Sequence, residues 1–407
     1  MVVLVHYVWL GVVLFFVAFV TVWMAFPSVL RMARVWKVYD NPDARKLQRK
    51  PVPVLGGVAV YIGILMGTAI LLCISYNKTL VLMLLAMTML LAVGVIDDRK
   101  NLPAGLRFVL EIGVVAVIVS ANGNMIDSLH GLWGINELPK WVAYPLSIVA
   151  GVGIINAINL IDGVDGYSSG FAMMACLLFG TIYYLSRVPG MAIVCLIVTG
   201  SVAPFFLHNV FGKKTKMFLG DGGTLMLGTL MTAFVFSILK EDSVCAKLET
   251  TGFGLIPFCL AVLSVPVFDT LRVMFGRMLR RTSPFKPDKT HLHHLFIGLG
   301  FSHIGTTTVI LFMDALVVAA QVTAWALGAS MEVQLYVVVA LGLLVTLGFY
   351  VFTNRQKKRD TTIYRAMRLQ GRISHIETTK FWEWMRKLVD DELFIEGRDE
   401  LLPDKSE

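Results

Sequence analysis

Short polar side chains recur every third residue at the end of an apolar run in this sequence. The set consists of Asn156, Asn159, Asp162 and Asp165, with Gly163 and Gly166 beside the two carboxylates. Residues three apart share one face of a helical turn, and the glycines let a ligand approach the backbone. A helix cap would account for one aspartate but not for four aligned groups. The spacing therefore predicts a binding or catalytic surface.

A second pair of carboxylates closes another apolar run. Asp97 and Asp98 follow the stretch 90–96 and precede Arg99 and Lys100. Neighbouring carboxylates repel one another, so the pair implies a bound cation, a shared proton or plain solvation. Taken alone, a solvated helix end explains this pair equally well.

A further aspartate, Asp221, lies among glycines in the segment 220–224. Because an apolar helix is expected to begin here, its first N–H groups form a potential anion site. Lys216 and two more lysines stand just upstream, and Phe218 lies between. Turns use the same residues, so the motif gains weight only from its position relative to the other carboxylates.

Two basic loops carry the remaining polar motifs. The loop 272–303 contains His291, His293 and His294. Zinc would need a fourth ligand that no cysteine or second histidine pair supplies, so we expect these side chains to donate to phosphate. In the first loop, Lys50 precedes a proline-rich stretch and the pair Gly56-Gly57, which alone can be a stiffened entry to a helix.

These motifs are spaced along a strongly apolar chain. Of its 407 residues, 56% are hydrophobic and 16% are charged, with a mean hydropathy of +0.72. This is more apolar surface than a soluble domain of this size buries. We therefore expect an all-α, polytopic membrane protein. Eleven segments are long enough to cross hydrocarbon, at about 3–26, 54–75, 79–96, 106–121, 141–160, 168–186, 190–209, 223–239, 253–275, 303–328 and 333–353. The segment 106–121 is the weakest, because Arg107 and Glu111 lie in its first turns.

The positive charges divide between the two sets of connections. Of the 36 Lys and Arg residues, only five lie in one set, namely Lys78, Lys140, Arg187, Lys240 and Lys247. Short cytoplasmic loops collect Lys and Arg, so we expect the N-terminus outside and the C-terminus in the cytoplasm. The net charge of +8 then faces membrane lipids, and nucleic acid is not an expected partner.

The chain is expected to form one membrane domain, residues 1–353, and a cytoplasmic tail, residues 354–407. The first apolar segment is longer than the core of a signal peptide, and no Ala-x-Ala site follows it before Arg31, so we interpret it as a retained helix. The tail mixes charges with aromatic residues at 381–384 and either forms an amphipathic helix on the membrane or stays solvated. The five cysteines show no pairing or metal spacing.

One membrane face is thus expected to collect all the polar motifs. The carboxylates are Asp97, Asp98, Asp162, Asp165 and Asp221, and the basic side chains are Lys50, Lys216, Arg277 and the three histidines. Oxygen ligands of this kind suit Mg²⁺ or Mn²⁺, and Mg²⁺ is commonly bound by one or two carboxylates plus substrate phosphates. The substrates should therefore be phosphorylated.

Together, the five motifs resemble those of the polyprenyl-phosphate N-acetylhexosamine-1-phosphate transferases, over about residues 39–303. In that family a lipid phosphate attacks the β-phosphate of a UDP-aminosugar and UMP leaves. The His-x-His-His form resembles the branch that uses UDP-N-acetylglucosamine, with undecaprenyl phosphate as acceptor, in the first membrane step of cell-surface polysaccharide assembly. The branch that transfers phospho-N-acetylmuramoyl-pentapeptide ranks second.

The resemblance also implies a location and residue roles. It implies a multi-pass protein of the bacterial plasma membrane with a cytoplasmic active site, and a homodimer is compatible with it. Asp221 would hold Mg²⁺, with Asp98, Asp162 or Asp165 near it, and Asp97 would position or deprotonate the lipid phosphate. The expected catalytic carboxylates are Asp97, Asp98, Asp162 and Asp165. Substrate would be bound by Lys50, Asn159, Asn209, Lys216, Phe218, Arg277, His291, His293 and His294. Gly222 and Tyr167 depart from the commoner family pattern without removing a charge, which leaves the fine sugar preference open.

A transporter for an anionic metabolite is the alternative from another class. Transporters place charges near the midplane on broken helices within repeated halves, whereas these carboxylates lie at helix ends on one side and no repeat is visible. Asp314, deep in the segment 303–328, is the exception and has no role in this scheme. An inactive scaffold is disfavoured because all five carboxylates are present.

Overall fold

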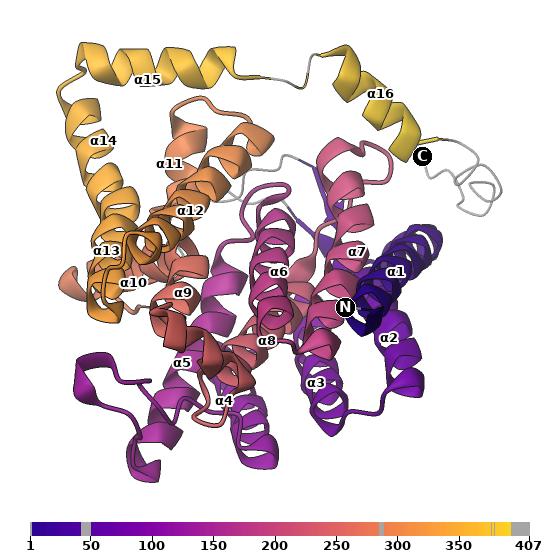
Figure 1. Ribbon diagram of the computed structural model, residues 1–407. Coiled ribbons are helices and arrows are strands. Elements are labelled where there is room, and N and C mark those ends of the chain that lie inside the picture. Colours follow the sequence, from indigo (N-terminus) through magenta and orange to yellow (C-terminus); the bar gives the residue numbers. More distant parts are fainter. Residues whose placement is uncertain (1, 42–49, 285–288, 376, 378, 392–407) are drawn as a thin grey trace.

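The protein is a bundle of long apolar helices with a helical tail across one end (Figure 1). The computed structural model describes residues 2–41, 50–284, 289–375, 377 and 379–391. The long helices are α1 (Val2–Val35), α2 (Gly56–Ile74), α3 (Lys78–Lys100), α4 (Ala104–Asn122), α5 (Lys140–Leu160), α6 (Tyr167–Leu185), α7 (Pro189–Phe211), α8 (Gly220–Leu239), α12 (His303–Ala326) and α13 (Met331–Leu343). Shorter elements are η1 (Leu132–Gly134), η2 (Val244–Thr251), α9 (Leu255–Val262), α10 (Ser264–Leu279), α11 (Leu292–Gly298), η3 (Leu344–Gly348), α14 (Phe349–Lys358), α15 (Thr362–Ile373) and α16 (Lys380–Val389).

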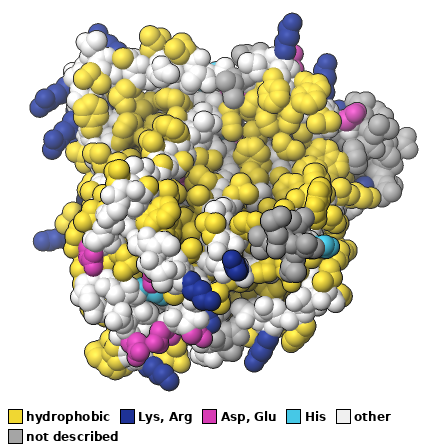
Figure 2. All heavy atoms as spheres, viewed as in Figure 1, with side chains coloured by type: hydrophobic (Ala, Val, Ile, Leu, Met, Phe, Trp, Pro, Cys, Tyr) yellow, Lys and Arg dark blue, Asp and Glu magenta, His cyan; other side chains and the backbone are white. Residues whose placement is uncertain are grey.

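Nine helices in the described part of the chain are long and apolar enough to cross a membrane. They are α1, α2, α3, α5, α6, α7, α8, α12 and the continuous run from α13 through α14. Hydrophobic side chains cover much of the face seen in Figure 2, as a lipid-facing surface requires. The expectation of a helical, polytopic membrane protein is confirmed.

Two of the eleven predicted segments differ from a simple crossing. The segment 106–121 forms α4, a helix of 19 residues that is not among the nine. The segment 253–275 is broken at Leu263 into α9 and α10, and η2 meets α9 at an angle of 105°. Asp314 explains part of this break, since its carboxylate accepts from Val265 N at 2.9 Å and Ser264 Oγ at 2.8 Å at the start of α10. The number of crossings and their direction stay predictions.

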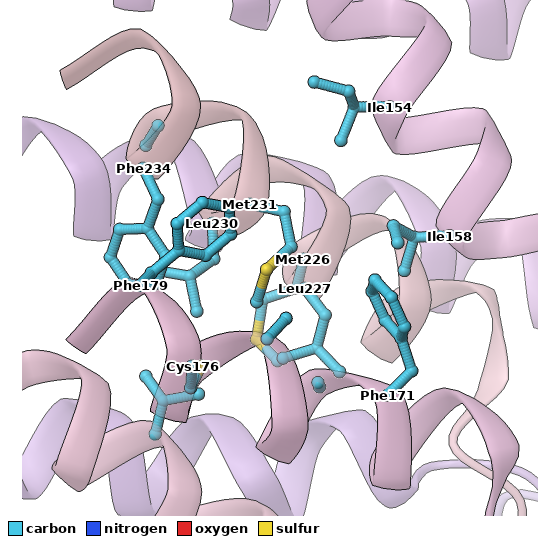
Figure 3. Packing of buried hydrophobic residues seen from close by; sticks show 14 of the residues in the cluster. Ile154, Ile158, Phe171, Cys176, Phe179, Met226, Leu227, Leu230, Met231 and Phe234 are labelled. Carbon is cyan, nitrogen blue, oxygen red and sulfur yellow. The ribbon is translucent and has the colours of Figure 1, made fainter. Parts of the chain in front are cut away.

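The core forms where α8 runs through the centre of the bundle. Nearly every side chain of α8 is buried, because α3, α5, α2 and α6 all pack against it. Figure 3 shows Phe171 and Phe179 of α6 facing Met226 and Phe234 of α8, with Ile158 of α5 alongside. This central position fixes the start of α8, and therefore Asp221, relative to its neighbours.

Glycines let α8 approach two helices at backbone distance. Gly57 of α2 lies against Gly223, and Gly94 of α3 lies against Gly222. A Cβ atom at either Gly57 or Gly94 would overlap backbone atoms of α8, which cannot move aside as a flexible side chain can. The approach also brings the proline-rich entry of α2 beside Phe218, whose N–H donates to Pro53 O at 2.9 Å. Just before α2 begins, the strand β2 (Val52–Pro53) pairs with β1 (Tyr39–Asp40).

Replacing Gly57 with Val is expected to destabilise the fold by about 2 kcal/mol or more, because the added atoms meet backbone. Thermal unfolding of the purified protein measures this loss. Gly153→Val is the matched control, since Gly153 is also inside a helix but a Cβ there meets nothing within 4 Å. Equal unfolding temperatures for the two variants would show that the α2–α8 contact tolerates separation.

Candidate active site

The predicted carboxylates gather where the ends of four helices meet. Asp97 and Asp98 lie in the last turn of α3, and Asp221 lies in the first turn of α8. The end of α5 and the start of α4 adjoin them, since α3 packs on both α8 and α4, and α5 packs on both α8 and α4. The expectation that these motifs share one face therefore agrees with the arrangement of the helices.

One guanidinium, that of Arg107, joins the two acidic motifs. Its Nη1 lies 3.2 Å from Asp97 Oδ2 and 3.4 Å from Asp221 Oδ2. Its Nε lies 3.3 Å from Oε1 of Glu111, a fully buried carboxylate. Arg107 and Glu111 weakened the prediction of a membrane span at 106–121 and were not predicted as site residues. Their spacing could have indicated a role inside the protein, because charges one turn apart in an apolar helix commonly face the protein interior.

Asp98 holds the start of α8. Its Oδ1 accepts from Asp221 N at 3.0 Å and its Oδ2 accepts from Gly222 N at 3.3 Å. Both oxygens are thus engaged with the positive end of a helix. Asp98 was expected among the metal ligands; its geometry instead fits a positioning role, in which it sets the orientation of Asp221.

The asparagines of α5 complete this cluster. Asn159 Nδ2 donates to Asp221 Oδ1 at 2.8 Å and also to Thr224 Oγ1 at 2.8 Å. Asn156 donates to Glu111. Asn159 therefore orients the Asp221 carboxylate, while Asn156 reaches it only through Glu111 and Arg107.

The expected row of four aligned polar groups is interrupted after Asn159. The helix α5 ends at Leu160, and the chain turns through residues 161–166 before α6 begins. Asp162 accepts from Ser168 Oγ at 2.5 Å, whereas Asp165 pairs with Lys216 Nζ at 2.5 Å and His303 Nδ1 at 3.0 Å. The prediction of one shared helical face was wrong for the two aspartates, because α5 ends at Leu160, before either of them.

The two aspartates of this turn have opposite electrostatic environments. The side chain of Asp162 is exposed, but protein atoms crowd around it and exclude bulk water. This desolvation, together with the nearby carboxylates Asp221 and Asp165, raises the pKa of Asp162 to about 7. Burial alone would raise the pKa of Asp165, but His303 and Lys216 more than offset it and hold its pKa below the usual range. Of the two aspartates in this turn, Asp162 is therefore the one expected to change charge near neutral pH.

The loop between α7 and α8 is held by Asn209. Its Oδ1 accepts from Gly166 N at 2.7 Å and its Nδ2 donates to Met217 O at 3.0 Å. Both ends of this amide serve the backbone, so the residue fits a positioning role more closely than the expected contact with substrate. The loop presents Lys216, whose ammonium also lies 5.9 Å from the ring centre of Phe218.

The histidine motif is anchored by a residue that the sequence interpretation missed, Asp269 of α10. His291 Nδ1 lies 2.9 Å from Asp269 Oδ2, and Arg272 Nη2 lies 2.6 Å from Asp269 Oδ1. The ring of His293 packs directly against Gly163, which brings the histidine motif to the turn that carries Asp162. Gly163 has no room for a Cβ there.

The histidines are largely enclosed. His291 and His293 are buried, while His294 is half-buried. Burial and the neighbouring His294 and His291 hold the pKa of His293 well below its usual range. His293 is therefore neutral near pH 7, and any hydrogen bond that it donates to phosphate comes from an uncharged imidazole.

Two predicted basic residues lie farther from the carboxylates. Arg277 is buried near the end of α10, where its Nη1 donates to Pro284 O at 2.5 Å. Lys50 is exposed at the edge of the described segment 50–284. The expected contact of both residues with substrate stays a prediction.

The donor chemistry of this site suits a divalent cation. No group of three His, Cys, Asp or Glu side chains within the described segments is arranged as a ready-made metal cage. Mg²⁺ needs only one or two carboxylates when substrate phosphates complete its shell. Asp221, whose side chain is 37% exposed, and the exposed Asp162 offer such oxygens, so the residues present fit the ion.

The fold and the site define a polytopic membrane protein with an acidic, phosphate-compatible centre at its helix ends. A sequence model described as glycosyl transferase family 4 matches residues 80–239. The chain is similar to a probable undecaprenyl-phosphate N-acetylglucosaminyl 1-phosphate transferase of Bacillus subtilis (strain 168), with 32% identity covering 77% of this chain and 86% of that protein. It is also similar to the undecaprenyl-phosphate alpha-N-acetylglucosaminyl 1-phosphate transferases of Escherichia coli (strain K12), with 27% identity covering 67% of this chain and 72% of that protein, and of Yersinia pestis, with 27% identity covering 69% and 75%. The chain therefore belongs to glycosyl transferase family 4, as its motifs indicated.

Proposed function

We propose that this protein transfers N-acetylglucosamine 1-phosphate from UDP-N-acetylglucosamine to undecaprenyl phosphate and releases UMP. The observation that carries the proposal is the convergence of Asp97, Arg107 and Asp221 at the ends of membrane helices. The names of the relatives support the same acceptor and the same transferred group, N-acetylglucosaminyl 1-phosphate. Cytoplasmic exposure of the site, eleven crossings and an outside N-terminus belong to the same proposal and are supported by the distribution of Lys and Arg.

The proposed mechanism depends mainly on positioning. A phosphate monoester has a second pKa of about 6, so the acceptor is largely dianionic near neutral pH and needs little help from a base. Asp97 accepts from Leu102 N at 2.6 Å and pairs with Arg107. These contacts favour a role in orienting the Arg107 guanidinium toward phosphate oxygens over a role as general base.

Asp221 and Asp162 would hold Mg²⁺ together with the phosphates of the UDP-sugar. When bound, the ion would neutralise negative charge that develops on the departing UMP. Asn159 keeps Asp221 in place, Lys216 with Asp165 secures the neighbouring turn, and His293 closes the far side of that turn against Gly163.

The ionisation of Asp162 gives the site a measurable pH dependence. Below pH 7 this carboxyl is mostly protonated and neutral, and above pH 7 it is ionised, because its pKa is raised to about 7. Infrared difference spectra of the metal-free protein between about pH 6 and about pH 8 should therefore lose a protonated-carboxyl band. The Asp162→Asn variant should lack that part of the band. An unchanged difference spectrum in the variant would assign the titration to another carboxyl.

The transfer activity is tested with purified protein, undecaprenyl phosphate and a panel of UDP-sugars. UMP release with UDP-N-acetylglucosamine, dependent on Mg²⁺, is the expected result. Release only with UDP-N-acetylmuramoyl-pentapeptide would select the second branch of the family. No UMP with any donor would refute the transferase proposal, and uptake of a phosphorylated metabolite into proteoliposomes would then support the transporter.

A further inference from the structure

The C-terminal tail crosses one end of the helical bundle, from the last membrane helix to α7. It leaves the last membrane helix through α14, runs as α15 above α11 and α12, and ends with α16 beside α7 (Figure 1). Gly371 of α15 packs on Leu299 and Phe301, and His375 Nε2 lies 2.9 Å from Gly300 O. The tail therefore has a fixed path over the loop that follows the histidine motif.

The helix α16 has one wide apolar face, of which one half is buried against the protein and the other half is largely exposed, although the ring centre of Phe381 still lies 6.3 Å from that of Phe211. Trp382, Met385 and Val389 are buried, and the ring centre of Trp382 lies 4.4 Å from that of Phe211 at the end of α7. The adjoining half of the face carries Phe381, Trp384 and Leu388, which are 60%, 58% and 45% exposed. These three apolar side chains share one stripe of the helix.

The position and charge of α16 indicate what covers this stripe. α7 is a candidate membrane span that ends at Phe211, so α16 lies at the depth where headgroups meet hydrocarbon and where aromatic side chains are favoured. Lys380, Arg386 and Lys387 outnumber the single acidic residue Glu383. A basic amphipathic helix of this composition is typical of an anionic membrane surface.

The basic charge of α16 is confined to the helix itself. The final residues 391–407 carry seven carboxylates and two cations in the sequence, so the attraction is assigned to α16 itself.

The residue after α16, Asp390, fixes the loop that carries Lys216. Its carboxylate accepts from the backbone N–H groups of Lys213, Lys214 and Thr215 at 2.8, 3.1 and 3.1 Å. It also accepts from Thr215 Oγ1 at 2.8 Å. One residue further along, Lys216 pairs with Asp165 of the candidate site.

We propose that α16 binds the anionic surface of the bilayer and that Asp390 transmits this contact to the loop 212–219. The lipid contact orders α16, ordered α16 holds Asp390 against the loop, and the loop holds Lys216 at Asp165. The first two steps stand without the transferase activity, whereas the consequence for catalysis rests on the proposed function.

Hydrogen exchange of the full chain in lipid nanodiscs tests the proposal. Adding phosphatidylglycerol to phosphatidylcholine discs should slow exchange of the α16 amides by about tenfold, the effect of one to two cations near an anionic surface. The loop amides of residues 213–215 should slow in parallel. The triple variant Phe381→Ser, Trp384→Ser, Leu388→Ser should lose both responses, and Glu383→Gln on the polar side of the same helix should retain them.

Asp390→Ala separates the lipid contact from its transmission. This variant should keep the lipid response of α16 and lose that of residues 213–215, so that the loop exchanges equally fast in both kinds of disc. Equal exchange of α16 in neutral and anionic discs of the unmodified protein would overturn the proposal. Protection of α16 that depends on protein concentration in neutral discs would overturn it in favour of a second copy of the chain. Neither outcome depends on UMP release, so failure of the transferase proposal is recognised separately.

Discussion

Replacing Asp221 with Asn lowers the rate of UMP release by about a thousandfold, the upper range for removing one group that stabilises developing charge. The amide keeps the volume of the carboxylate and can still accept from Asn159, but it removes the negative charge beside Arg107. It also removes one carboxylate of the proposed Mg²⁺ site. The measurement is UMP release at saturating UDP-N-acetylglucosamine, with Mg²⁺ varied.

The fold should survive this substitution, because the contacts that hold the start of α8 use the backbone N–H groups of Asp221 and Gly222. Thermal unfolding of the variant checks this. Asp242→Asn is the matched control, since Asp242 lies just beyond the opposite end of the same helix with its side chain 83% exposed. Turnover of Asp221→Asn equal to that of Asp242→Asn would remove Asp221 from the metal site.

Hydropathy and charge predicted the helices and the grouping of the acidic motifs well, because both are local properties of the chain. Nine of the predicted segments became helices long enough to cross a membrane, and the ends of α3, α5 and α8 meet as expected. Hydropathy did not predict the break at Leu263, although the segment 253–275 contains Pro257 and Pro266 as well as the charged residues Asp269 and Arg272. The break depends on Asp314, which hydrogen-bonds the start of α10 from another helix.

The sequence predicted which residue types gather at the candidate site, and the roles of the individual residues stay predictions. The turn at 161–166, which separates Asp162 from Asp165, packs Gly163 against His293, a contact between residues 130 positions apart. Likewise, Asp98 and Asn209 match the family motifs, but each accepts a hydrogen bond from a backbone N–H group that is distant in the sequence. Spacing within one segment carries no information about such partners.

The spacing of Arg107 within its own segment likewise did not reveal its partners Asp97 and Asp221. Removing Arg107 should have the second large effect. Arg107→Met leaves three carboxylates, Asp97, Glu111 and Asp221, without their common cation. Breaking a fully buried ion pair from one side costs about 3 kcal/mol, and the cost here is smaller because the side chains of Arg107 and Asp221 are partly exposed. We therefore expect a lower unfolding temperature together with a rate of UMP release reduced by about a hundredfold, the cost of losing one donor to phosphate.

A second substitution distinguishes the two consequences of losing Arg107. Glu111 is fully buried and touches the site only through Arg107 and Asn156, so Glu111→Gln in the Arg107→Met background removes one uncompensated charge. The double variant should regain part of the lost stability and none of the lost activity, because the guanidinium that faces Asp97 and Asp221 is still absent. Recovery of both properties would mean that Arg107 serves only the fold, and the orientation of phosphate would then have to be assigned to Lys216 or the histidine motif.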